Sequence, residues 1–291
     1  MRIQIDHLTR YHYTLPMRSV IQLLRVTPQT NAHQTVVSWN INVDCDARIT
    51  PYVDAFGNAC HIMAIDHSVS DLSIEVTGLV DTWPGSAGII DAAEPLPELV
   101  FLQPTMLTQA DEAITRFAYD VAGDLQQNPL DRCHALMTAL WREISFDTRA
   151  TSTLTDAAAA FADRRGVCQD LAHIFISACR TLKIPARYVS GHLLRQDGAE
   201  WQEAAHAWAE AHITGLGWVS FDPANCVSAD EHYLRVACGL DYRDAAPVSG
   251  ARYGGGFETL SVDLRVRGPG LGKTIQGQMG QGQMGQDSAN Q

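Results

Sequence analysis

The chain has 291 residues, of which 46% are hydrophobic, and a formal net charge of −12 from 21 basic and 33 acidic side chains. This acidic balance argues against nucleic acids and anionic membrane surfaces as partners. The apolar content suffices for one large domain or two smaller ones, and no stretch approaches the roughly 18 apolar residues of a membrane span.

The N-terminus and the cysteines indicate a compartment. The first residues contain no uninterrupted apolar run of the kind that a signal peptide requires. Seven cysteines are scattered along the chain without paired spacing, which is typical of free thiols in a reducing environment and not of a disulfide framework or a zinc knuckle. We therefore expect a cytoplasmic protein that needs no metal or other cofactor.

Short runs of alternating apolar and polar residues fill residues 1–82. One run extends from Val37 to Cys45 and another from Leu72 to Val76. Period-two alternation with polar breaks predicts an antiparallel sheet or sandwich. The five histidines of this part show no ligand spacing, so we expect a structural or substrate-shaping module.

Residues 83–104 contain four prolines and two glycines and are predicted to be a linker. The core is expected to span residues 105–267, and the Gly/Gln-rich residues 268–291 are expected to be disordered. Within the core, apolar spacing predicts helices over about 111–121, 130–144 and 157–162. Trp141 lies on the apolar stripe of the second helix, and we expect it to be buried there.

A longer buried helix is predicted to begin at or just after Cys168. Apolar residues follow at helical spacing, and Pro185 ends the helix. Gly166 lies where the chain must turn tightly into the helix. A cysteine at a helix N-terminus is close to unpaired amides and the positive end of the dipole, both of which favour the thiolate. Cys168 is therefore a candidate nucleophile, although a buried small hydrophobe is the commoner role of cysteine.

Two strands joined by a hairpin turn are predicted next. Residues 203–213 alternate strictly, with His206, Trp208, Glu210 and His212 on one face. Residues 214–217 have turn composition, and the strand over 218–225 contains Asp222. We expect the alanine-rich face to be packed and the other face to line a wetter site. An imidazole and a carboxylate on neighbouring strands, facing a thiol, supply a nucleophile, a base and an orienting group.

This arrangement depends on the register of the hairpin. A four-residue loop that paired Ile213 with Trp218 would turn Asp222 to the face opposite His206, because side chains alternate along a strand. We therefore predict a bulge or an odd-length turn near residues 215–217.

A metal site is the alternative use of the alternating strand. Its ligands would be His206, Glu210 and His212, since residues two apart along one strand can converge. The tryptophan between them and the available cysteine favour the nucleophilic site.

Three segments, in this order, resemble the core motifs of the transglutaminase-like superfamily. They are Gly-Val-Cys-Gln-Asp at 166–170, His-Ala-Trp-Ala-Glu at 206–210 and Trp-Val-Ser-Phe-Asp-Pro at 218–223. The resemblance extends to Ile-Pro-Ala-Arg-Tyr-Val-Ser-Gly at 184–191. Residues 1–82, notably Tyr-His-Tyr at 11–13 and Phe-Gly-Asn at 56–58, resemble the β-rich N-terminal module of bacterial members. His192 and Ala224 depart from the family pattern, which often has tyrosine and threonine there.

The resemblance implies an α+β protein with an N-terminal antiparallel β domain and a papain-like or transglutaminase core, in which the nucleophile's helix packs on an antiparallel sheet. It implies a Cys168–His206–Asp222 triad. Gln169 and Trp208 are candidate supporting residues for the oxyanion, although a capping or buried hydrogen-bonding role fits Gln169 equally well. Transglutaminases use a tryptophan upstream of the cysteine for such support, which leaves a second role open for Trp141.

The implied chemistry is acyl transfer from an amide of a peptide or protein. With water as acceptor the protein would be a cysteine protease or amidase, and with an amine it would be a transglutaminase. Hydrolysis is favoured slightly, because bacterial relatives of this type are often identified as cysteine proteases. A non-catalytic peptide-binding module on the same fold is the third possibility, against which the complete Cys/His/Asp set argues. The oligomeric state stays open.

Overall fold

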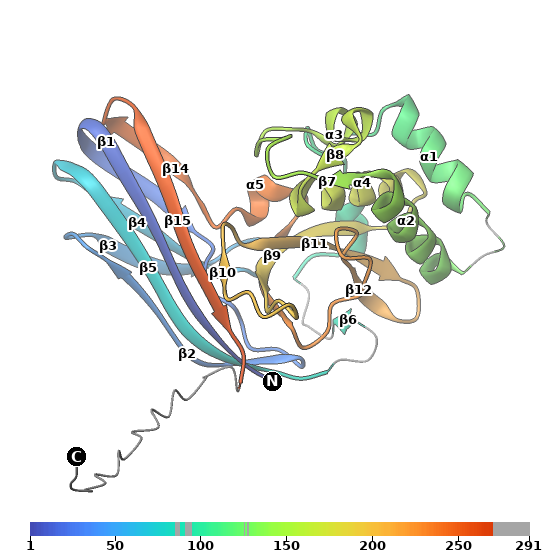
Figure 1. Cartoon of the computed structure of the whole chain (residues 1–291), viewed down its shortest axis with the longest axis horizontal. Coiled ribbons are helices and arrows are strands. Elements are labelled where there is room, and N and C mark those ends of the chain that lie inside the picture. Colours follow the sequence, from blue (N-terminus) through green and yellow to red (C-terminus); the bar gives the residue numbers. More distant parts are fainter. Residues whose placement is uncertain (85–87, 91–94, 125, 127, 270–291) are drawn as a thin grey trace, which may run out of the picture.

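The computed structural model describes residues 1–84, 88–90, 95–124, 126 and 128–269. Figure 1 shows long strands packed side by side in one half of the molecule and helices gathered over a second sheet in the other half. The expected α+β class is confirmed, with an N-terminal antiparallel β region followed by a mixed core. Of the tail expected to be disordered, all but Gly268 and Pro269 lies outside the described residues.

The N-terminal β module is an eight-stranded sheet. Its strands are β1 (Arg2–Leu24), β2 (Gln34–Val43), β3 (Arg48–Val53), β4 (Ala59–Ile65), β5 (Val69–Thr82), β10 (Trp201–Gln202), β14 (Val248–Gly254) and β15 (Glu258–Arg267). The first half of β1 pairs with β5 and β15, and the second half pairs with β4 and β14. Alternate residues of β1 are buried, as period-two patterning requires.

Two strands of this module come from the far end of the chain. Residues 248–267 were expected to belong to the core, but β14 and β15 pair with β1 (Figure 1). The apolar side chains Leu264 and Val266 of β15 are fully buried with Ile3 and Ile5 of β1. The alternation within residues 258–267 predicts a strand, whereas its partner, more than 240 residues away along the chain, leaves no local signal.

The core has a five-stranded sheet in the order β13-β9-β11-β12-β6. Its strands are β6 (Ile89–Ile90), β9 (Ala186–Leu193), β11 (His206–Ile213), β12 (Gly217–Phe221) and β13 (Tyr233–Gly239). The helices are α1 (Glu112–Ala122), α2 (Pro129–Glu143), α3 (Ala157–Asp163), α4 (Cys168–Thr181) and the short α5 (Tyr242–Ala245), so the four predicted helices are confirmed. The alanine face of β11 packs against the buried α4.

Side-chain caps explain why three of these helices begin where they do. The side chains of Asp111, Asn128 and Asp156 each accept a hydrogen bond from a backbone N–H in the first turn of α1, α2 and α3. Trp141 was expected to be buried but is 52% exposed, at the edge of the apolar stripe of α2. A short parallel pair, β7 (Ser145–Phe146) and β8 (Arg165–Gly166), leads the chain into α4.

The predicted linker takes part in the core. β6 pairs with β12, and the 3₁₀ helix η1 (Glu98–Leu102) buries Phe101 edge-on against Trp218 with ring centroids 5.0 Å apart. Proline and glycine content therefore marks a segment without long regular structure here, not one without contacts. Among the described residues, no helix is long and apolar enough to cross a membrane.

Candidate active site

Cys168 is the first residue of α4, as predicted. The preceding Val167 donates its backbone N–H to the Asp170 carboxylate at 2.8 Å, and the Thr151 hydroxyl donates to the same oxygen at 2.6 Å. A side chain on Gly166 would place a Cβ 2.7 Å from the Asp170 Cβ, so only glycine allows this close turn. The Asp170 carboxylate thus fixes the backbone at the start of the helix, where Cys168 is the first residue.

His206, the first residue of β11, contacts the other two predicted catalytic residues. Its Nε2 lies 2.6 Å from Oδ2 of Asp222. Cys168 lies beside the ring and, together with Asp222, raises the pKa of the imidazole. The three side chains are therefore brought together, although they come from a helix, a strand and the residue after a second strand.

The turn between β11 and β12 has the odd length that was predicted. Ile213 pairs with Gly217, which leaves a three-residue loop, and Ala209 pairs with Phe221. Extending this register by one residue puts Asp222 opposite Trp208, which has the same parity as His206. Gly215 and Gly217 adopt φ values of 87° and 82°, a region that residues with a side chain rarely enter. The glycines therefore allow the turn that aligns the histidine with the carboxylate.

Asp222 is fully buried and accepts five hydrogen bonds. Besides His206, the Tyr233 hydroxyl and the Asn225 amide each donate to Oδ2 at 2.7 Å. The backbone N–H groups of Ala224 and Asn225 donate to Oδ1 at 2.9 and 3.2 Å. Burial alone would raise the pKa of Asp222, but these donors lower it below its usual value. The carboxylate is therefore held ionised and in one orientation.

Sequence reasoning did not identify Tyr233 or Asn225 as site residues. Asn225 follows Asp-Pro-Ala in a turn that closes on the aspartate, and this local pattern could have indicated it. Tyr233 reaches Asp222 from β13, which does not pair with β12, so no local signal links the two.

The charge state of His206 follows from these contacts. Burial would lower the pKa of His206, but the hydrogen bond to the Asp222 carboxylate and the neighbouring Cys168 raise it to about 10. The imidazole therefore carries both protons near neutral pH. Such an imidazolium beside a thiol stabilises the thiolate and can later donate a proton to a leaving group.

The two predicted supporting residues lie close to the triad in different ways. Gln169 is buried, and its amide nitrogen lies 3.4 Å from the Thr153 carbonyl oxygen, so the hydrogen bond it donates there is long and weak. Trp208 is also buried, packing edge-on against Tyr233 at 5.3 Å between centroids and lying nearly parallel to the His206 ring at 6.1 Å. Its indole N–H has no partner among the described residues. Both therefore have packing or bonding roles that do not require an oxyanion.

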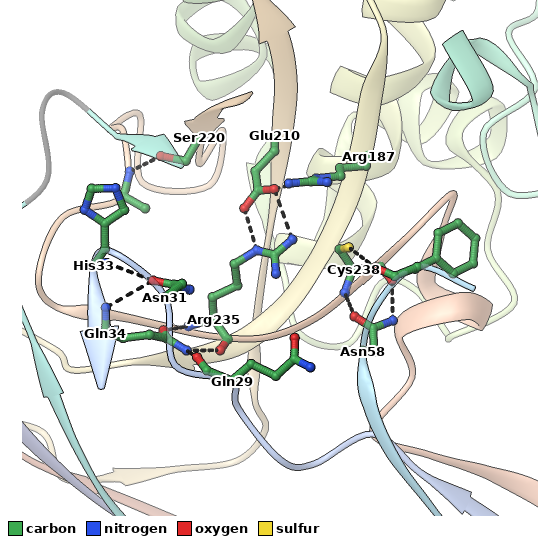
Figure 2. A network of polar contacts seen from close by, with 12 residues as sticks. Gln29, Asn31, His33, Gln34, Asn58, Arg187, Glu210, Ser220, Arg235 and Cys238 are labelled. Atoms are coloured by element: carbon green, nitrogen blue, oxygen red, sulfur yellow. Dashed lines mark hydrogen bonds and ion pairs between the residues drawn. The ribbon is translucent and has the colours of Figure 1, made fainter. Parts of the chain in front are cut away.

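The alternative metal site on β11 is not assembled. Glu210 is fully buried, and its carboxylate oxygens accept hydrogen bonds from Arg187 at 2.6 Å and Arg235 at 2.9 Å (Figure 2). His212 packs edge-on against Trp218 instead. The face expected to be wet is therefore covered, because Phe101 and the N-terminal module's Phe56 pack over this side of the sheet.

One group of possible cation ligands lies outside the triad. Within the part of the chain that the structure describes, the ligand atoms of Asp230, Glu231 and His232 come within 4.8 Å of one another, on the loop before β13. Asp230 and His232 also hydrogen-bond to each other at 2.9 Å. Exposed acidic clusters of this kind are common in proteins without a metal, and no further feature marks this one as a metal centre.

Comparisons with known proteins agree with this architecture. Residues 117–223 match the transglutaminase-like superfamily, and residues 3–81 match the bacterial transglutaminase-like N-terminal region. An uncharacterized protein of Mycobacterium leprae (strain TN) is 29% identical over 284 residues, covering 91% of this chain and 98% of its own. An uncharacterized protein of Mycobacterium tuberculosis (strain H37Rv) is 26% identical over 275 residues, covering 87% and 88%.

A solved structure shares the whole fold. It is that of a candidate cysteine protease from Cytophaga hutchinsonii, with a TM-score of 0.74 and 22% identity over 92% of this chain and 90% of that one. The similarity therefore includes the N-terminal β module as well as the core.

Proposed function

Because the chain belongs to the transglutaminase-like superfamily and has the bacterial N-terminal region, we propose that it is a cysteine hydrolase acting on amide bonds of peptides or proteins. Cys168 is the nucleophile, His206 the general acid and base, and Asp222 the group that orients His206. The observation that carries this proposal is the 2.6 Å contact between His206 and the buried Asp222 carboxylate, beside Cys168 at the start of α4.

The proposed reaction has two halves. The Cys168 thiolate attacks the amide carbonyl carbon, and the tetrahedral intermediate collapses to a thioester as His206 gives its proton to the leaving amine. Water then attacks the thioester, His206 takes a proton from it, and the acid leaves as Cys168 regains its thiolate. The Cys168 backbone N–H, in the unpaired first turn of α4, is a donor for the oxyanion. One such donor typically contributes about 3 kcal/mol to transition-state stabilisation.

The first test is the reactivity of Cys168. We expect iodoacetamide to alkylate Cys168 rapidly down to about pH 6, and we expect His206→Ala to abolish this reactivity at low pH. Mapping by mass spectrometry allows Cys226, which is also partly exposed, to serve as an internal reference in the same sample. If Cys168 labels no faster than Cys226 at low pH in the wild type, a binding module replaces the enzyme as the better proposal.

The second test separates water from an amine as the acyl acceptor. A glutamine- and amide-bearing peptide library is incubated with and without a labelled primary amine, and products are identified by mass. Hydrolysed products in both samples support the hydrolase. Incorporation of the amine in preference to hydrolysis would instead identify a transglutaminase with the same three residues. Cys168→Ala and, as the matched control, Cys226→Ala are carried through both incubations.

A further inference from the structure

β13 is the outer strand of the core sheet and carries a donor to the triad. Among the described strands it pairs with β9 on one side only. The backbone N–H and C=O groups on the free side of such a strand require other partners.

Two side-chain amides of the N-terminal module supply those partners. The Gln34 oxygen accepts from the Arg235 N–H at 3.0 Å, and its nitrogen donates to the Arg235 carbonyl at 2.8 Å. Asn58 makes the same pair of bonds with Cys238, both at 2.8 Å (Figure 2). Each amide thus bonds one β13 residue as a neighbouring strand would. Both side chains are only 3% exposed, so water does not compete for these bonds.

Both amides are held in position by their own module. The Gln34 nitrogen also donates to the Gln29 carbonyl at 2.8 Å. The Asn58 nitrogen also donates to the Asp54 carboxylate at 3.0 Å, and Arg25 pairs with the same carboxylate at 3.2 Å. The amides are therefore pre-organised, so that little side-chain entropy is lost when they bind β13.

Tyr233 lies two residues before the first of these contacts. Its hydroxyl donates to Oδ2 of Asp222, and its ring lies 5.9 Å from the His206 ring and edge-on to Trp208. Between β13 and β11, Gly191 of β9 has no side chain, and a Cβ there would be 2.1 Å from the Leu234 carbonyl oxygen. The position of the Tyr233 hydroxyl therefore depends closely on where the β13 backbone lies.

We propose that Tyr233 is a positioning residue for the Asp222–His206 pair, and that the N-terminal module sets its position by clamping β13 through Gln34 and Asn58. The idea extends the proposed function, since it gives the module a role in the site. Two titratable side chains face Asp222, His206 from β11 and Tyr233 from β13. Cys168 is the further neighbour of His206, and Asp230 is the further neighbour of Tyr233.

The test observes the Asp222–His206 pair directly and needs no activity. The Nε2 proton of His206 is followed by NMR as the pH is lowered, and its signal is lost when Asp222 takes up a proton. Tyr233→Phe removes one donor to the carboxylate, so the pH of loss should rise by about one unit. Tyr253→Phe, an exposed tyrosine on β14, is the matched control and should leave that pH unchanged.

The clamp is tested by Gln34→Glu and Asn58→Asp, which keep the side-chain shape but turn an oxygen toward a β13 carbonyl. Both variants should raise the pH at which the His206 signal is lost, as Tyr233→Phe does. Asn40→Asp, at an exposed position of β2, is the control. Melting temperatures are measured for every variant. If the folded Tyr233→Phe variant lost the His206 signal at the same pH as the wild type, Tyr233 would have no positioning role.

If Gln34→Glu and Asn58→Asp lowered the melting temperature but left that pH unchanged, the module would only stabilise the core, and the clamp proposal would be wrong. Because the signal belongs to His206 and Asp222, these outcomes can be read even if Cys168 proves to be unreactive. Failure of the proposed function is therefore distinguishable from failure of this inference.

Discussion

Asp222 is a fully buried carboxylate whose charge raises the pKa of the neighbouring His206. An unpaired charge at a fully buried position costs several kcal/mol, and here five donors offset that cost. The bonds also leave the carboxylate one orientation, which directs the charge at Nε2 of His206. The effect of the Asp222 charge on the site can therefore be tested separately from the size and shape of the side chain.

Asp222→Asn tests this separation. The amide keeps the shape but lacks the charge that stabilises the imidazolium, so the pKa of His206 should fall. We expect kcat/KM for amide hydrolysis to fall by roughly 10²- to 10⁴-fold, together with the rate of Cys168 alkylation at pH 6. Asp120→Asn, at an exposed position of α1, should change neither. A variant that kept more than about a third of wild-type activity would exclude the orienting role.

The raised pKa of His206 predicts how stability depends on pH. A group whose pKa is higher in the folded state stabilises fully below its unfolded pKa, about 6.5, and this contribution is lost as the pH rises through the folded value of about 10. The difference in free energy of unfolding between wild type and His206→Gln should therefore shrink between pH 6.5 and 10. Urea unfolding at several pH values measures it, with His12→Gln at an exposed site as control. A difference that stays constant over this range contradicts the prediction.

Among the elements, the core sheet contains an ion cluster across three neighbouring strands. Glu210 of β11 pairs with both Arg187 of β9 and Arg235 of β13, and the Arg187 guanidinium also lies 3.9 Å over the Trp218 ring. Arg187 and Glu210 are both fully buried. The arginines, which lower the pKa of Glu210 against the effect of burial, make the cluster sensitive to the loss of the carboxylate.

Glu210→Gln should therefore destabilise the fold. It removes the buried negative charge that faces both arginines, and we expect the free energy of unfolding to fall by about 3–5 kcal/mol. Denaturant titration measures the loss. Glu112→Gln, which breaks the exposed pair with Arg116 on α1, should cost less than about 0.5 kcal/mol. If the two variants lost the same free energy of unfolding, the buried cluster would contribute no more to stability than the exposed pair.

A feature of these elements can be predicted from the sequence when the residues that determine it are close to it along the chain. The start of α4 at Cys168 and the odd-length turn after Ile213 were predictable, because a helix start and a strand register depend on residues a few positions away. The burial of both faces of β11 and the reach of Tyr233 to Asp222 were not. They arise from contacts with Phe56, Phe101 and β13, and nothing near β11 in the sequence encodes those neighbours.

At the scale of the whole molecule, the first and the last of the described strands complete one module. β1 begins at Arg2, and its neighbour β15 ends at Arg267. The core lies between them in the sequence, so the N-terminal module and the core are not two consecutive units. The module therefore cannot be complete without residues from beyond the core.

Truncation tests this dependence. A chain that ends at Ala246 lacks β14 and β15 and uncovers the apolar residues Ile3 and Ile5, which Leu264 and Val266 cover. We expect it to be insoluble or to lose its cooperative thermal transition, measured by circular dichroism. The reference is a chain that ends at Pro269. A shortened chain that melted cooperatively at the reference temperature would mean that β1 needs only β4 and β5.

The pairing of β1 with β15 also bears on how the protein is made. Gln4 pairs with Arg267, so the first strand to leave the ribosome waits for one of the last. At translation rates of about 5–20 residues per second, that delay is on the order of ten seconds or more. During this time the edge of β1 that later pairs with β15 is unpaired and open to pairing with other chains.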